Sequence, residues 1–452
     1  MHVERVDMTA IAESFGRRVA ALRARLPVAI AYAGSSASLV LGSLAQLLAF
    51  AVLARSLGPA QFGALLTITA ITSVALNLVG LGASEPMVRR VAVDPALYPK
   101  MLGHNLILSA STALIVFPAA AAVIVGYAQA SQHTELPVTT ALAFAFANTV
   151  LLRVVLVSEQ AFIGRKLFGA ASLVILALGI ARIATAALAC LVFGVQDLSS
   201  WALWHLAGLA VLAGVCVAAI APLGRPAWVV RTEDLRQGFF FLLAQLGLAL
   251  RQTVDILVLG LVAPASVVGT FGIARRIADT SYLTVDALHR ITYPRLAIAM
   301  VPGLHAGRPM ALRIAAAALV IAFVTAISVY VVAPVLPVIF GQQYEQTVGF
   351  VRALCWVVIP YALWDIGAEA LGASANHGKR AALINASVLG VALIAVMTYL
   401  FQTTGTIVAI YIVDSALALA FWWLILTFPA GGAARREPRF PGVDNLGSEE
   451  AP

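Results

Sequence analysis

The chain has 452 residues, of which 61% are apolar and only 11% are charged, and its mean hydropathy is +0.95. This composition excludes a soluble globular protein, which would need charged side chains over much of its surface. The formal charge of +8 does not indicate nucleic-acid binding, because the basic residues occur in twos and threes between apolar runs. We therefore expect an integral membrane protein with no nucleic-acid partner.

Apolar runs recur along the whole chain, each long enough to cross a hydrocarbon core of ~30 Å as a helix. Backbone groups in lipid need partners within the segment, and the alternating pattern of a transmembrane barrel is absent. We predict an all-α polytopic membrane protein with twelve transmembrane helices in two six-helix bundles around a central cavity. In chain order, the spans are predicted at 28–54, 62–84, 104–128, 138–160, 167–193, 199–221, 237–262, 267–289, 312–333, 348–373, 381–402 and 405–428.

The predicted domains follow from these spans. Residues 1–27 are basic with apolar side chains on one helical face, which predicts a cytoplasmic amphipathic helix on the inner membrane surface. Residues 28–222 form the predicted N-terminal six-helix lobe, and a cytoplasmic linker at 223–236 joins it to the C-terminal six-helix lobe at 237–430. Residues 431–452 are polar and rich in Gly and Pro, so we expect a disordered cytoplasmic tail.

Lysine and arginine are segregated between the two sides of the predicted membrane. Twenty-two of the 29 lie in seven segments that share one side, and the other seven are all Arg within spans or at their ends. The positive-inside rule then places both termini in the cytoplasm.

The sequence contains no sign of a cofactor. Cys190, Cys216 and Cys355 all lie in apolar spans, where we expect core residues and neither a disulfide framework nor a metal cluster. The segment 372–380 (GASANHGKR) has the wrong glycine spacing for an ATP-binding loop. We expect the energy source to be an ion gradient, the membrane potential, or consumption of product on the far side.

The two halves of the chain show a weak internal repeat. The first and seventh spans run in the same direction, and each is followed by Pro a few residues before a Gly–aromatic region: LGPAQFG at 57–63 and APASVVGTFG at 263–272. A repeat of this kind is common in transporters that are built from two related halves.

Three segments of the chain carry a family resemblance: RSLGPAQFG at 55–63, GLG at 80–82 ahead of Arg89-Arg90, and the stretch from Phe340 to Lys379. Their order and spacing resemble the polysaccharide flippases of the multidrug/oligosaccharidyl-lipid/polysaccharide exporter superfamily. The resemblance covers about residues 30–428. It implies a flippase of the bacterial inner membrane that moves an undecaprenyl-pyrophosphate-linked oligosaccharide from the cytoplasmic to the periplasmic leaflet, with polysaccharide polymerase or assembly proteins as candidate partners.

Arginine within the spans suggests a path for an anion, because a charge in hydrocarbon is costly and usually functional. Guanidinium groups stay charged and bind phosphate oxygens in pairs, which suits a pyrophosphate. The predicted substrate-binding residues are Arg153, Arg182, Arg251, Arg275 and Arg276. The alternative is structural ion pairing, since Arg251 and Asp255, and likewise Arg275 and Asp279, are four residues apart on one helix.

Carboxylates within the spans are candidates for coupling transport to H+ or Na+, and the first choices are Asp255 and Asp279, followed by Asp365 and Glu369. They could equally serve as counter-ions for the arginines. Glu85, at the inner end of the second span, is either a gate residue that pairs with Arg89 or Arg90, or an interfacial helix end.

Two other functions stay open at this stage. An ion-coupled drug or cation antiporter of the same superfamily should have an acidic cavity, whereas these spans carry more Arg than Asp and Glu. A membrane-embedded glycan polymerase or ligase is expected to place catalytic residues on a sizeable outer loop, and the longest outer loop here runs only from Ala128 to Pro137. We therefore expect a transporter of a lipid-linked oligosaccharide and not an enzyme.

Overall fold

The computed structural model describes residues 8–131, 136–374, 376–386 and 388–429, with side chains from Leu41 onward except at 43, 290 and 377. Within this part of the chain the secondary structure consists of helices without strands. The α-helices are α1 (Met8–Leu78), α2 (Ser84–Val93), α3 (Tyr98–Ser131), α4 (Val138–Ala145), α5 (Leu152–Gly164), α6 (Phe168–Ala187), α7 (Leu198–Ile220), α8 (Thr232–Val262), α9 (Ala265–Met300), α10 (Leu304–Val332), α11 (Leu336–Phe340), α12 (Gln346–Leu354), α13 (Val358–Ala373), α14 (His377–Ala386) and α15 (Val388–Thr427).

Nine helical stretches of the described chain are long and apolar enough to cross a membrane. Two of them contain a backbone break, at Gly58 (φ 74°) in α1 and at Gln402 (φ 49°) in α15. Both breaks fall where two neighbouring spans were predicted to meet. The more polar α9 is not among the nine, although the eighth predicted span lies within it. The chain is therefore an all-α, multi-pass membrane protein, and the count of twelve spans stays a prediction.

Several helices extend beyond the predicted spans. The predicted loop at 84–103 contains α2, which buries Pro86, Met87 and Val91 on one face. The predicted loop at 290–311 is mostly helical, because α9 continues to Met300 and α10 begins at Leu304. Helical backbone lets these positively charged segments satisfy their own hydrogen bonds at the membrane boundary.

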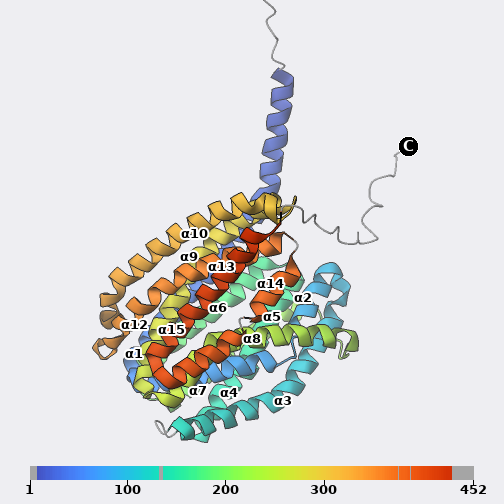
Figure 1. Ribbon diagram of the computed structural model, residues 1–452. Coiled ribbons are helices and arrows are strands. Elements are labelled where there is room, and N and C mark those ends of the chain that lie inside the picture. The colour runs from blue at the N-terminus through green and yellow to red at the C-terminus, as the bar shows by residue number, and fades with distance from the viewer. Residues whose placement is uncertain (1–7, 132–135, 375, 387, 430–452) are drawn as a thin grey trace, which may run out of the picture.

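At the N-terminus, α1 begins at Met8 and stays helical as far as Gly58, so the predicted amphipathic segment continues directly into the first span. Figure 1 shows this first part of α1 projecting away from the helical body. The apolar face predicted for residues 1–27 lies outside the described side chains, and the predicted tail at 431–452 lies outside the described residues.

Helix α1 connects the two halves of the molecule. It packs along α6 in the N-terminal half and along α8 and α9 in the C-terminal half. Figure 1 shows α9, α10 and α13 on one side of the body and α2, α3 and α5 on the other. One buried apolar cluster includes residues of both halves, and a second is confined to the N-terminal half. The three cysteines are buried, as predicted for core residues.

The two halves touch closely at two levels, and glycine permits both contacts. On the predicted outer side, a Cβ atom built on Gly63 would lie 1.9 Å from the carbonyl oxygen of Ala265 and 2.9 Å from the nitrogen of Gly269. On the predicted cytoplasmic side, a Cβ on Gly82 (φ 72°) would lie 2.1 Å from the carbonyl oxygen of Gly238. A larger residue at Gly63 or Gly82 would push the backbones apart.

Candidate substrate cavity

A cavity of about 580 Å³ lies between these two contacts. Its wall is formed by the second part of α1 together with α8, α9, α13 and α15. On α1, the lining residues run from Leu66 to Ser73 and are thus flanked in sequence by Gly63 and Gly82. The volume falls in the ~300–1,000 Å³ range of pockets that hold a small molecule.

Arg275 lies in the cavity wall and is paired with two carboxylates. Its Nε is 2.9 Å from Oδ2 of Asp255 on α8, and its Nη1 is 2.7 Å from Oδ1 of Asp279 one turn along α9. Asp255 is buried, with its side chain 2% exposed, and its Oδ1 accepts a hydrogen bond from its neighbour's backbone, Ile256 N, at 2.8 Å. This arrangement matches the predicted structural pairing of Arg275 with Asp279.

Arg251 also lines the cavity, but its partner differs from the predicted one. Its guanidinium group pairs with Asp414 on α15, and Asp255, four residues along the same helix, pairs instead with Arg275. The guanidinium carbon of Arg251 also lies 5.1 Å from the ring centroid of Trp364. Arg251 pairs with Asp414 on another helix because Asp255 turns toward α9, where it pairs with Arg275.

Arg276 and Arg182 are different, because no described carboxylate pairs with either of them. Arg276 lines the cavity from α9 and lies over the ring of Phe50, 5.3 Å from its centroid. Arg182, on α6 in the N-terminal half, donates a hydrogen bond of 3.1 Å to Gln46. Gln46 and Phe50 are one turn apart on α1, so two unpaired guanidinium groups from opposite halves approach the same stretch of that helix. The two charges are close enough to repel each other.

Arg153 lies outside the cavity lining. Its guanidinium group donates to Ser84 and Ser109, both at 3.1 Å, and to Asn105 at 3.0 Å. It fills the space beneath Gly80 (φ 85°), where a Cβ atom would lie 2.3 Å from one of its nitrogens. These contacts tie α5 to α2 and α3, and a role of Arg153 in substrate binding stays a prediction.

The predicted gate pair of Glu85 takes a different form in the structure. Glu85 is exposed in the first turn of α2. Arg90 pairs with Asp234 on α8 at 2.6 Å, and Arg89 donates a hydrogen bond to Gln237. The α2 arginines therefore bind the C-terminal half, because Asp234 is buried beside them whereas Glu85 faces outward.

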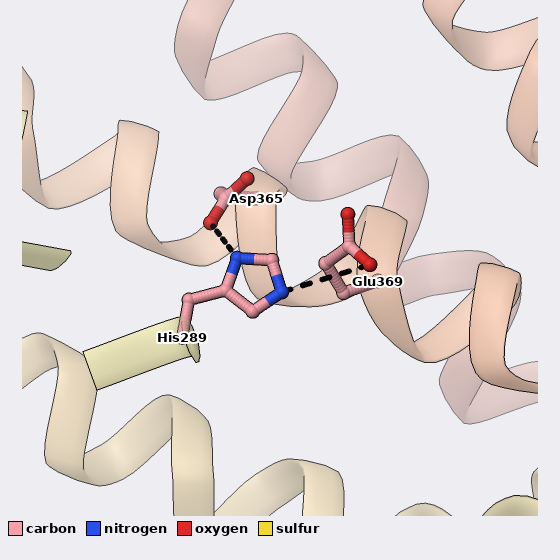
Figure 2. Close-up of side chains that lie close together, drawn as sticks. All are labelled: His289, Asp365 and Glu369. Carbon is pink, nitrogen blue, oxygen red and sulfur yellow. Dashed lines mark ion pairs between the residues drawn. The ribbon is translucent and has the colours of Figure 1, made fainter. Parts of the chain in front are cut away.

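Asp365 and Glu369 lie away from the cavity arginines and flank His289 of α9. Figure 2 shows the imidazole ring between the two carboxylates, both of which come from α13. Nδ1 is 3.2 Å from Oδ2 of Asp365, and Nε2 is 3.6 Å from Oε2 of Glu369. Glu369 also accepts a hydrogen bond of 2.7 Å from Arg380. The sequence prediction missed His289, because a lone histidine at a span end gives no signal of its own.

The charges in the cavity lining are balanced. Three arginines face it, and so do three aspartates, of which Asp286 was not predicted as a site residue. Tyr361 donates a hydrogen bond of 3.0 Å to Asp286 and stacks on Tyr282, with ring centroids 4.0 Å apart. Any affinity for an anion must therefore come from the arginines without a carboxylate partner, above all Arg276.

The helical architecture is that of a membrane transporter. The lipid II flippase MurJ, in an inward closed conformation, matches with a TM-score of 0.68 at 13% identity, over 87% of this chain and 88% of its own. A multidrug resistance MATE family transporter of the MOP superfamily matches in its inward-facing conformation with a TM-score of 0.63 at 16% identity, over 84% of this chain and 93% of its own. A multidrug resistance MATE family transporter of this superfamily in its outward-facing conformation matches with a TM-score of 0.56 at 17% identity. The match covers 87% of this chain and 94% of the transporter chain.

The family is shown by the sequence. A family model described as "Polysaccharide biosynthesis protein" matches residues 33–297, more than half of the chain, and the chain belongs to that family. No curated protein matches the sequence. The predicted superfamily is thereby confirmed, and the fold is that of its transporters.

Proposed function

We propose that the protein is a flippase that moves an undecaprenyl-pyrophosphate-linked oligosaccharide from the cytoplasmic to the periplasmic leaflet of a bacterial inner membrane, for surface polysaccharide synthesis. Membership of the polysaccharide biosynthesis family supports the class of cargo. The single observation that carries the proposal is a pair of guanidinium groups for which no described carboxylate is a partner: Arg276, which lines the cavity, and Arg182, which approaches the same stretch of α1 from the other half.

The chemistry of the cargo explains this arrangement. A pyrophosphate and a glycan cannot cross ~30 Å of hydrocarbon unaided, because an unpaired charge there costs several kcal/mol. Arg276 and Arg182 would bind the pyrophosphate from opposite halves, and the remaining polar lining would face the sugar next to it. The polyprenyl tail would stay in lipid. Opening the contact at Gly82 and then the one at Gly63 would present the cavity to one side at a time.

An ion-coupled antiporter for cationic drugs is the second candidate. It is favoured by one observation, the three aspartates in the cavity lining (Asp279, Asp286 and Asp414). Two of them already pair with arginine, at Arg275 and Arg251, which leaves less acid for a cationic cargo than the count suggests.

The test uses purified protein in liposomes with a fluorescent lipid-linked oligosaccharide and an impermeant quencher outside. We expect transfer between leaflets with unchanged glycan length, and a loss of about tenfold or more in rate for Arg276→Gln and for Arg182→Gln. Arg352→Gln is the matched control, because Arg352 also lies in a span over an aromatic ring, 4.8 Å from the centroid of Tyr330, but outside the cavity lining. Glycan elongation would indicate a polymerase, and dye export without lipid transfer would indicate an antiporter.

A further inference from the structure

The cluster around His289 has a geometry that suits a proton better than a metal ion. Its two ring nitrogens face different carboxylates, Nδ1 toward Asp365 and Nε2 toward Glu369, as Figure 2 shows. A single metal ion can bind only one nitrogen of an imidazole ring. An ion held by all three residues would therefore need the ring to rotate out of its place between the acids.

The donor count leads to the same conclusion. A neutral imidazole carries one N–H, so one carboxylate would face a nitrogen lone pair, whereas the doubly protonated ring presents an N–H to each carboxylate. Oδ2 of Asp365 is buried without a hydrogen-bond partner among the described residues, and Nδ1 of His289 lies 3.2 Å from it as an ion-pair contact. The charges agree, since Asp365 and Glu369 carry two negative charges and Arg380 supplies one positive charge. One proton on His289 makes the cluster neutral.

Among the described side chains, few other titratable groups lie near the ring. On α9 itself, the ring of Tyr293 lies 5.8 Å away and Asp286 is one turn earlier. Helix α13 supplies Asp365 and Glu369, and α14 supplies Arg380. The described parts of α1, α8, α10 and α12, which also pack against α9, bring no carboxylate into ion-pair distance of the ring.

The cluster is connected to the cavity by polar side chains. Tyr361, which is one turn before Asp365 on α13, donates to Asp286 at 3.0 Å, and both line the cavity. Asp286 is in turn three residues before His289 on α9, and such residues are neighbours on a helix surface. On the other side, Arg380 belongs to the predicted cytoplasmic segment and its side chain is 35% exposed.

We propose that His289 is a proton-binding residue of the C-terminal half and that Asp286, Tyr361, Asp365 and Glu369 connect it to the cavity on one side and to the cytoplasmic end on the other. Loss of the proton leaves a net negative charge between α9 and α13, which weakens their packing. Helix α9 also carries Arg276, thirteen residues and about 20 Å away along its axis. As a coupling device this inference rests on the proposed transport function, but as a proton site it does not.

The first test needs no transport. The protein is labelled with ¹⁵N in its seven histidines, reconstituted in bilayers, and studied by solid-state NMR, with His289→Gln to assign the resonances. If that variant does not fold, Glu369→Gln assigns them by shifting the signals of the intact ring. We expect two protonated ring nitrogens at pH 7.5. A ring with a single N–H at that pH overturns the proposal.

Two further outcomes would also overturn it. Binding of Zn²⁺ by wild-type protein that is lost in His289→Gln but kept in His305→Gln would show a metal site, and His305 is a suitable control because it is exposed on the neighbouring α10. A shift of the His289 resonances when Na⁺ replaces K⁺ would show a monovalent metal cation.

The second test addresses coupling in liposomes. A one-unit pH gradient changes the ratio of loaded to empty proton sites by about tenfold between the two sides, and we expect it to change the flipping rate of wild type and His305→Gln. His289→Gln should flip at a rate that does not depend on the gradient, and retained dependence would overturn the coupling role. If wild-type protein moves no lipid-linked sugar, the proposed function fails while the NMR result stands.

Discussion

The neighbouring arginines Arg275 and Arg276 should respond in opposite ways to the same substitution. Both are on α9 and both line the cavity, so the sequence does not distinguish them. In the structure, Arg275 is the counter-ion of two aspartates, whereas Arg276 contacts an aromatic ring. We predict that Arg275→Gln lowers stability and that Arg276→Gln lowers transport.

The stability cost at Arg275 follows from its burial. Its side chain is 13% exposed and that of Asp255 is 2% exposed, so the substitution leaves a buried carboxylate without a counter-ion. Breaking a buried ion pair by removing one partner costs about 3–5 kcal/mol. Uptake of a proton by Asp255 would place the measured loss of unfolding free energy toward the lower end of that range. Even so, it is a large share of the ~5–15 kcal/mol that keeps a typical protein folded.

The expected cost at Arg276 lies in transport instead. Loss of its contact with Phe50 removes about 0.5–2 kcal/mol of cation–π attraction, so the fold should persist. A hydrogen bond to a charged phosphate oxygen contributes about 1.5–3 kcal/mol, which corresponds to about tenfold or more in affinity for the cargo.

Both variants can be measured in parallel with Arg352→Gln as the control. Thermal unfolding in detergent, followed by tryptophan fluorescence, reports stability, and the liposome assay reports transfer between leaflets. The reasoning would be refuted if Arg275→Gln unfolded like wild type, or if well-folded Arg276→Gln transported at the wild-type rate.

Three other predictions address particular contacts. Arg251→Met alone should destabilise the protein by about 3–5 kcal/mol, because it leaves Asp414 (side chain 7% exposed) unpaired. Adding Asp414→Leu should recover most of the lost stability, measured by thermal unfolding, and no recovery would contradict the buried pair. Gly63→Ala should hold α1 and α9 apart on the predicted outer side, which would be measured as a longer distance between spin labels on the two helices. Gly349→Ala is the control, because a Cβ at Gly349 meets nothing within 4 Å. Equal spin-label distances in the two variants would reject the contact. Asp197 caps α7, and the hydrogen bond from the backbone N–H of Ser200 lowers the pKa of its carboxyl group. The charged cap therefore stabilises the fold at pH values above the ordinary pKa of 3.8, and this stabilisation is lost as the pH falls through the lowered pKa. Asp197→Ala should therefore cost about 0.5–2 kcal/mol at pH 7 and less at pH 3, and a pH-independent difference in thermal unfolding would exclude the charged cap.

The helical architecture could be predicted from sequence because lipid imposes a length on each span. The break at Gly58 coincides with a predicted loop for the same reason, since Gly-Pro interrupts a run that is too long for one crossing. The predicted loop at 84–103 was too long, because the length of an apolar run says nothing about an amphipathic helix such as α2 that lies beyond it.

The site could be predicted only where its contacts are local. The pair Arg275–Asp279 follows from their spacing of four on one helix. Asp255 and Asp414 find their arginines on other helices, and no sequence pattern specifies which guanidinium group each will meet. The same reason explains why Arg276, which pairs with no described carboxylate, could not be distinguished from Arg275 before the helices were placed together.

The two contacts that flank the cavity differ in chemistry, and this difference suggests how an anionic cargo would enter. The contact on the predicted outer side joins backbone to backbone at Gly63. The contact on the predicted cytoplasmic side includes Asp234, which is buried and bound by Arg90 at 2.6 Å and Arg231 at 2.9 Å, while both arginines remain partly exposed. A pyrophosphate carries more negative charge than a carboxylate and binds guanidinium groups in pairs, so it can replace Asp234 as their partner. In the proposed mechanism, arrival of the cargo from the cytoplasm would itself weaken the contact that keeps the two halves together on that side.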